Sequence, residues 1–293
     1  MNAGVIILCL IWGFNFVIMK LGNDYFPPGE FAALRFSTGA LVLLGVSFIK
    51  RVPLPSKSDL KWLILCGIFQ TAYFNIAIQV SLNHIDAGLT SVLTYSMPLF
   101  LTLMAHQWIP NDRLTTRKMV GIIVGIIGLF LAMNIQLDGS VFIMLFALSS
   151  AVSWATANLL LKLKLQHCNA VQYTTWQMTI GTIGLWAYTL LFEQGTESQW
   201  ELTSIFYILF AGVIASALAF VMWSYILKHT EASKASTSIL LVPIVGVISG
   251  VIFLDETLSI ITVAGIALVL TGVYIVNGKS LSKKQAIKHS TKD

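Results

Sequence analysis

Amide and aromatic side chains recur inside long apolar stretches of this sequence, and such groups bind small molecules by hydrogen bonding and ring stacking. Trp12 and Asn15 lie about one helical turn apart in one stretch, and Trp154 and Asn158 repeat the pair in another. Further side chains of these kinds within such stretches are Tyr73, Asn75 and Tyr95. Because polar groups are costly in hydrocarbon, they usually face the interior of a helix bundle. We therefore expect all of them to line a cavity near the middle of the bilayer; hydrogen bonding and packing between helices is the alternative for any one of them.

Arg35 is the cation that lies deepest in an apolar stretch, about six residues inside the stretch 30–49. An arginine at the bilayer midplane costs roughly 2.5 to 3.5 kcal/mol on insertion scales. Two interpretations are open: the side chain extends toward the membrane surface, or it offers a positive charge to an anionic group of a substrate. The middles of the stretches hold no Asp or Glu, so the carboxylate of a typical proton relay is missing and a coupling ion is left open.

Pro98 and Pro243 lie in the middle of apolar stretches, each 31 residues after a glycine, Gly67 and Gly212. A proline within a helix removes one backbone donor, so the carbonyl four residues earlier would lose its helical partner. Such gaps are tolerated in a membrane where another group or a water-lined cavity compensates. We expect the two prolines to act as hinges or cavity walls; inert kinks are the alternative.

Composition places these residues in a membrane protein. The chain has 293 residues, of which 56% are hydrophobic and 11% charged, more apolar surface than one soluble core of this length can hide. Apolar runs of about 18 to 22 residues recur along it, and each can cross roughly 30 Å of hydrocarbon. The ten predicted spans are 4–21, 30–49, 61–81, 87–108, 118–135, 140–161, 170–191, 204–226, 235–254 and 259–277. The expected fold class is an all-α integral membrane protein with ten transmembrane helices.

The equal glycine-to-proline spacings indicate a duplication. Trp12 with Lys20 and Trp154 with Lys162 are a second sign of it, because the two residues of each pair are eight positions apart. Each copy holds five predicted spans, and because five is odd the second copy must enter the membrane from the opposite face. We expect two inverted five-helix repeats, at residues 1–136 and 137–278, followed by a basic cytoplasmic tail at residues 279–293.

Charge alternates between the loops. Most of the 18 Lys and Arg residues lie in alternate loops and in the tail, so the positive-inside rule predicts that both termini are cytoplasmic. Equivalent turns of the two copies differ as an inversion requires: residues 112–118 carry three bases, and residues 256–262 carry none. The net charge of +5 then reflects topology, and we expect no nucleic-acid partner. The cysteines Cys9, Cys66 and Cys168 lack metal-ligand spacing, and we expect no metal and no cofactor.

These motifs together resemble a known family. The sequence W-G-F-N-F at residues 12–16, the duplicated prolines and the turn D-E-T-L at residues 255–258 look like the drug/metabolite transporter superfamily, specifically its EamA group. The resemblance covers residues 1 to about 278. It implies a ten-helix carrier in the inner (plasma) membrane with a central cavity between the halves and the fifth and tenth spans at the periphery. It also implies outward movement of amino acids, related metabolites or small toxic compounds. Asp112 stands where the first-half turn of the family usually has Glu, a change that keeps the charge.

Two functions are compatible with this pattern. The first is a secondary transporter that works by alternating access, and the alternative is a passive channel or facilitator for small solutes. An enzyme is not expected, because H-E-x-x-H, G-x-S-x-G and paired intramembrane aspartates are missing from the sequence. The expected partners are a small-molecule substrate and the lipid bilayer, and the sequence does not indicate an oligomeric state.

Overall fold

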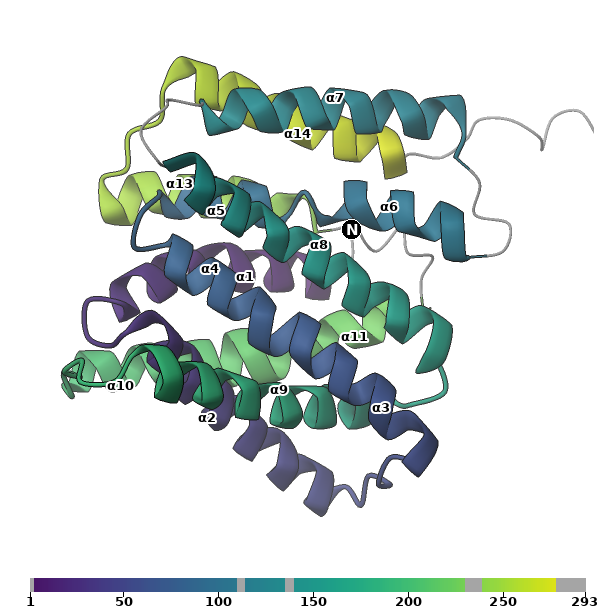
Figure 1. The fold of residues 1–293 in the computed structure, drawn as a ribbon, viewed down its shortest axis with the longest axis vertical. Helices are drawn as coiled ribbons and strands as arrows, with labels where there is room; N and C mark the ends of the chain where they lie inside the picture. The colour runs from purple at the N-terminus through teal and green to yellow at the C-terminus, as the bar shows by residue number, and fades with distance from the viewer. Residues whose placement is uncertain (1–2, 110–113, 135–139, 230–238, 278–293) are drawn as a thin grey trace, which may run out of the picture.

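The computed structural model describes residues 3–109, 114–134, 140–229 and 239–277, and the regular elements within these ranges are helices. Figure 1 shows them packed as one bundle, with most helices running along or against a common direction. The predicted boundary at residues 136 and 137, the tail 279–293 and Asp112 lie outside the described residues.

The helices follow one another in two series. The first consists of α1 (Ala3–Gly22), α2 (Pro28–Ile49), α3 (Lys57–Cys66), the π-helix η1 (Gly67–Tyr73), α4 (Phe74–Ser81), α5 (Ala87–Thr94), α6 (Met97–Trp108) and α7 (Thr116–Met133). The second consists of α8 (Ser140–Lys164), α9 (Ala170–Phe192), α10 (Leu202–Leu209), the π-helix η2 (Phe210–Leu218), α11 (Ala219–His229), α13 (Leu241–Leu254) and α14 (Ile260–Asn277). Local chemistry explains several helix starts. Pro28 occupies the first position of α2, and the side chains of Ser56, Thr115 and Asn169 each accept a hydrogen bond from the backbone N–H three residues later.

Seven stretches of helix are long and apolar enough to cross a membrane: Gly4–Gly22, Pro28–Ile49, Lys57–Ser81, Ala87–Trp108, Thr116–Met133, Ser140–Lys164 and Leu202–His229. Two shorter apolar helices are Leu241–Leu254 and Ile260–Val276. The α9 helix has 23 residues, but its two glutamines and five threonines make it more polar. These elements fit a multi-pass membrane protein. Helix is present in each of the ten predicted stretches, while only seven meet the criteria of length and hydropathy within the described ranges.

The helices α7 and α14 pack against each other along one edge of the bundle (Figure 1). A Cβ atom at Gly121 would lie 2.8 Å from the carbonyl oxygen of Gly272, and a Cβ at Gly128 would lie 2.9 Å from the carbonyl oxygen of Gly265. Glycine is therefore needed for this backbone-to-backbone contact.

The two π-helical segments lie at matched positions, since η1 (Gly67–Tyr73) corresponds to residues 212–218 within η2. Each faces a close helix crossing. A Cβ at Gly67 would lie 2.8 Å from the carbonyl oxygen of Gln177 in α9, and a Cβ at Gly212 would lie 2.5 Å from the carbonyl oxygen of Arg35 in α2. The sequence predicts one regular helix over each of these stretches, and the structure corrects that prediction at both crossings. π-Helical turns inside α-helices are frequent at functional sites.

Pro98 does not kink a continuous helix, which corrects the picture of a proline inside one long span. The chain leaves α5 at Thr94, passes through Tyr95 and Ser96, and begins α6 at Met97. Pro98 thus lies in the first turn of α6, where backbone N–H groups have no acceptor within the helix anyway. Pro243 is likewise the third residue of α13.

Candidate functional site

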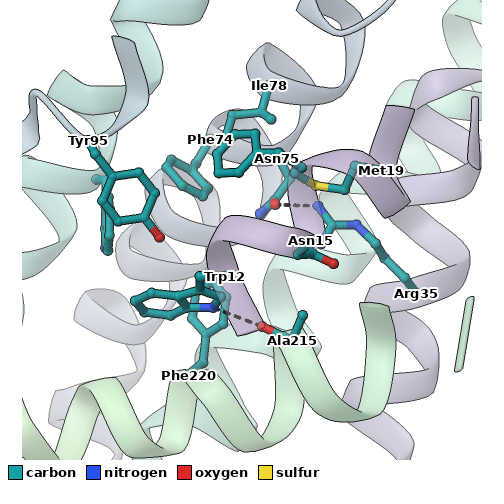
Figure 2. A pocket seen from close by; sticks show the side chains of 12 residues that line it. Trp12, Asn15, Met19, Arg35, Phe74, Asn75, Ile78, Tyr95, Ala215 and Phe220 are labelled. Carbon is teal, nitrogen blue, oxygen red and sulfur yellow. Dashed lines mark hydrogen bonds between the residues drawn. The ribbon is translucent and has the colours of Figure 1, made fainter. Parts of the chain in front are cut away.

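A small cavity lies where the two series of helices meet (Figure 2). Its lining comes from α1 (Trp12, Asn15, Phe16, Met19), α2 (Arg35), α4 (Phe74, Asn75, Ile78), the end of α5 (Tyr95), α8 (Trp154), η2 (Ala215) and α11 (Phe220). About 30 Å³ is open to the centres of water-sized spheres. Because one water needs roughly 10–15 Å³ by this measure, the cavity holds about two waters and is closed to a metabolite.

The structure brings six of the eight predicted cavity residues together: Trp12, Asn15, Arg35, Asn75, Tyr95 and Trp154. Tyr73 does not line the cavity; its side chain is 39% exposed and its hydroxyl lies 2.8 Å from that of Ser149. The reason is helical geometry: Tyr73 lies two positions before Asn75, and two positions along a helix place a side chain on nearly the opposite face. Asn158 does not line it either. Its amide oxygen accepts a hydrogen bond from the Trp223 indole at 3.3 Å.

Five aromatic rings form one wall of the cavity. The ring of Trp12 meets that of Trp154 edge to face at a centroid distance of 5.8 Å and that of Phe220 at 5.6 Å. Tyr95 and Phe74 pack on Trp154 at 5.2 and 5.4 Å. Tilted and edge-to-face contacts at these distances are the favoured aromatic geometries, so the rings hold one another in place. They present a rigid apolar surface to the cavity.

Arg35 and Asn75 form the polar wall. The Arg35 Nη2 donates to Asn75 Oδ1 at 2.7 Å, and the Asn75 amide nitrogen donates to the carbonyl oxygens of Thr71 and Gln70 at 2.8 and 3.2 Å. Both carbonyls belong to η1, so the π-helix supplies the acceptors that orient Asn75. Figure 2 shows Arg35, Asn75 and Asn15 together, on the side away from the rings of Trp12 and Tyr95.

Three cavity residues carry a buried polar atom with no hydrogen-bond partner among the described residues: Oδ1 of Asn15, Nε of Arg35 and Nε1 of Trp154. A buried polar atom left unpaired costs about 1–3 kcal/mol. Trp12 differs, because its indole nitrogen donates to the carbonyl oxygen of Ala215 at 3.0 Å. The cavity therefore offers one free acceptor and two free donors to a bound molecule.

One end of the bundle is closed by charged groups, and we call it the Glu256 end. Lys20 Nζ at the end of α1 lies 2.9 Å from Glu256 Oε1, in the turn after α13. The same carboxylate accepts hydrogen bonds from the backbone nitrogens of Ala87 and Gly88, at 2.6 and 3.0 Å, and so caps α5. A carboxylate at a helix N-terminus is favoured by the helix dipole. Three helices are thus tied together at this end.

The pKa of Asp86, which lies beside this pair and outside the spans, is raised by burial and then by the charge of Glu256, while Lys20 acts in the opposite direction. In the sequence, Glu256 is distinguished only as part of the D-E-T-L turn. The ends of α1 and α5 that it joins are 236 and 169 residues away in the chain, so no local pattern reveals its partners.

Asp59, His167 and Cys168 form the one group among the described residues that could hold a metal ion, with ligand atoms within 4.8 Å of one another. His167 Nε2 lies 3.0 Å from Asp59 Oδ2, and the His167 side chain is 62% exposed. Burial and the charge of Asp59 raise the pKa of the Cys168 thiol, which opposes metal binding. Asp59 is also about 24 Å along the helix from Asn75, so the group is separate from the cavity.

The chain resembles known proteins over nearly its whole length. A family model described as the EamA-like transporter family matches residues 2–134 and 141–278. A protein of Bacillus subtilis (strain 168) with the name "Uncharacterized transporter YoaV" is 30% identical over 277 residues, which cover 93% of this chain and 94% of that protein. A "Probable amino-acid metabolite efflux pump" of Salmonella typhimurium is 28% identical and covers 92% of both chains. A solved crystal structure that is 16% identical matches with a TM-score of 0.68 over 94% of this chain and 97% of its own, a likeness that concerns the fold alone.

Proposed function

Because this chain belongs to the EamA-like transporter family, we propose that it is a secondary transporter of the plasma membrane that exports small molecules by alternating access. The family and its relatives make it a transporter and not an enzyme. The substrates we propose are amino acids, related metabolites or small toxic compounds. The name of the Salmonella typhimurium relative, an amino-acid metabolite efflux pump, supports both the class and the outward direction.

The lining of the cavity is the main observation that supports the proposal. It lies between the two series of helices, it combines an aromatic wall with an arginine, and it contains three unpaired polar atoms. Such a combination of apolar lining and a few directed polar groups is typical of sites for small molecules. We propose that the six predicted residues in its lining bind the substrate, and that Tyr73 and Asn158 support the neighbouring helices.

The packing supports two inverted five-helix halves. Helix contacts occur in matched pairs. The contact of α1 with α13 corresponds to that of α8 with α5 and α6. The contact of α2 with η2 corresponds to that of α9 with η1. Three further close pairs, α2 with α9, α5 with α13 and α7 with α14, join matched helices to each other. Matched contact pairs are what a two-fold axis between the halves produces, and an odd number of spans in each half requires that axis to lie in the membrane plane. We propose accordingly that ten helices span the bilayer.

We propose that the Glu256 end faces outward, in keeping with cytoplasmic termini. There Lys20, Asp86 and Glu256 lie together, and only 4% of the Glu256 side chain is exposed. At the opposite end of α1, a surface pocket of about 690 Å³ lies between Val5 of α1, Ala170 of α9 and Met222 of α11. One closed end and one hollowed end are what a carrier presents in one of its two states. The matched positions in the other half are Lys162 for Lys20, Glu231 for Asp86 and Asp112 for Glu256, and the last two of these lie outside the described residues.

The test is counterflow in proteoliposomes that contain the purified chain and a radiolabelled amino-acid panel. An alternating-access carrier should show saturable uptake, and unlabelled amino acid on the far side should accelerate it. Flux that rises linearly with concentration and ignores the far side would favour the passive channel or facilitator instead. Protein-free vesicles and vesicles with an unrelated membrane protein give the background.

A further inference from the structure

Arg35 is a buried cation without a counter-ion among the described residues. Its side chain is 2% exposed, and its one hydrogen bond goes to the neutral amide of Asn75. Its guanidinium also lies 4.6 Å from the centre of the Phe36 ring, a contact that compensates only part of the lost hydration. Buried charges in proteins are normally paired, and an unpaired one is unfavourable unless something else supplies the opposite charge.

The unsatisfied part of the guanidinium belongs to the cavity. Arg35 lines it, and the N–H at its Nε has no acceptor among the described residues. A guanidinium binds a carboxylate through parallel N–H donors, so a free Nε beside a terminal nitrogen suits a carboxylate. Asn15 lies on the same side of the cavity as Arg35 in Figure 2. Its Oδ1 has no partner among the described residues, and because an amide oxygen is an acceptor, it needs a hydrogen-bond donor from the substrate. An N–H group close to the carboxylate would meet that requirement.

The residues at the matched positions of the second half add no positive charge, so the site suits a substrate with one negative charge. The interval that separates Trp12 from Trp154 matches Arg35 with Gln177 and Asn15 with Ala157. Gln177 does not line the cavity, and its amide oxygen accepts from the Thr71 hydroxyl at 2.7 Å. Among the described residues, the lining therefore contains one cation, Arg35, and no second one from the other series of helices.

From these observations we infer that Arg35 is the carboxylate anchor of the cavity and that its substrate is a small monocarboxylate with a flat, apolar body. This inference rests on the proposed transport function and names the chemistry that selects the cargo. The carboxylate meets Arg35, the apolar body meets Trp12, Trp154 and Phe220, and an N–H donor on the substrate meets Asn15. Because the cavity holds about two waters, the anchor is occupied only after the halves separate enough to admit the body.

The experiment uses the purified full chain in detergent and four probes that share one phenyl body: L-phenylalanine, 3-phenylpropionate, 3-phenylpropanamide and phenethylamine. Affinity is measured by ligand-induced thermal stabilisation and by equilibrium dialysis. We expect the two carboxylates to bind at least tenfold more tightly than the neutral amide and the amine. Equal affinity for 3-phenylpropionate and 3-phenylpropanamide would overturn the anchor, and so would an absence of binding by all four probes.

Substitutions test whether the preference for carboxylates depends on Arg35. Arg35→Gln, which installs the residue of the matched position, should remove the preference for carboxylates, and Arg35→Lys should retain part of it. Gln177→Ala is the matched control and should keep the full preference. The ligand-free Arg35→Gln protein should melt at the same or a higher temperature, since it no longer buries an unpaired charge. A preference that survives in Arg35→Gln contradicts the inference.

Counterflow distinguishes failure of the anchor from failure of the proposed function. Saturable exchange of the neutral or the cationic probe, unchanged in Arg35→Gln, would leave a transporter whose selectivity lies elsewhere. Binding that depends on Arg35 without any exchange would remove the transporter proposal and leave a binding site. Asn15→Leu should weaken L-phenylalanine at least threefold and leave 3-phenylpropionate unchanged, because only the first has an N–H donor.

Discussion

The two series of helices, residues 3–134 and 140–277, agree in their close helix crossings. Gly39 of α2 packs on the Gly212 carbonyl in η2, and Gly181 of α9 packs on the Gly67 carbonyl in η1. Gly39 and Gly181 are separated by the same interval as Trp12 and Trp154, and both crossings coincide with a π-helix. Backbone contact at a crossing leaves no room for a side chain, so both series need glycine there.

The same two series differ in what they present to the cavity. Position 35 is an arginine where its match, 177, is a glutamine, and Asn75 corresponds to Phe220. The first series thus supplies the polar wall, while the second supplies Trp154 and Phe220 to the aromatic wall. Packing keeps the two series alike at the crossings, because each crossing has the same geometry, whereas on our proposal the two walls of the cavity differ because a small molecule presents different groups to them.

The largest effect should follow from breaking the shared crossing. Gly39→Ala and Gly181→Ala each place a methyl group against the partner helix, and each should lower the free energy of unfolding by about 1–3 kcal/mol, because overpacking strains a closely packed core. Gly45→Ala is the control, since an added Cβ there meets nothing within 4 Å. The measurement is the melting temperature of the detergent-purified chain. Loss of stability at only one of the two crossings would show that they are not equivalent.

The two matched tryptophans provide the next test. Trp12→Phe removes the hydrogen bond that the buried indole donates to Ala215, which should cost about 0.5–1.5 kcal/mol beyond the loss of ring volume. Trp154→Phe removes an indole nitrogen that has no partner among the described residues, so the ligand-free protein should lose only the packing of the larger ring and less stability than Trp12→Phe loses. Thermal unfolding of both variants checks the difference. Equal losses would mean that the Trp154 nitrogen is satisfied in the protein in solution.

The two prolines test whether the halves move alike. We expect Pro98→Ala and Pro243→Ala to slow turnover several-fold while changing the substrate affinity less, because alanine favours a continuous helix at the start of α6 and of α13. Rates of counterflow together with equilibrium binding separate the two quantities. Unchanged or faster turnover would make the prolines plain helix starts, and an effect in one variant alone would assign the movement to one half.

The smallest effect concerns the Glu256 end. Burial and Glu256 raise the folded-state pKa of Asp86 above its ordinary value of 3.8, and Lys20 opposes this. The folded state then holds the proton more tightly, so this group's contribution to stability is lost as the pH rises from about 3.8 through the raised value. Asp86→Asn should remove that loss and raise the melting temperature slightly at pH 7, with little change at pH 4. A lower melting temperature at pH 7 would mean that the Lys20 contact dominates.

Part of the cavity could be predicted from the sequence because polar side chains within a membrane are stable in few places. Asn15, Arg35 and Asn75 interrupt apolar runs, and a polar residue in hydrocarbon has few stable positions other than the bundle interior. The same argument fails for Tyr73, whose amphipathic ring tolerates an exposed position with its hydroxyl on Ser149. It also fails to separate Asn158 from the lining, because a buried amide can be satisfied by a neighbour such as Trp223.

Apolar runs of span length are enough to predict the helices, and the described ranges contain helix in every predicted stretch. The sequence by itself also determined which positions correspond between the copies, because a duplication preserves spacing. The inverted ten-helix arrangement remains a proposal on that basis. Tertiary structure alone decided the π-helical turns and the partners of Glu256. The physical reason is that each of these depends on a backbone or side chain more than a hundred residues away or on the space between helices, which no local spacing encodes.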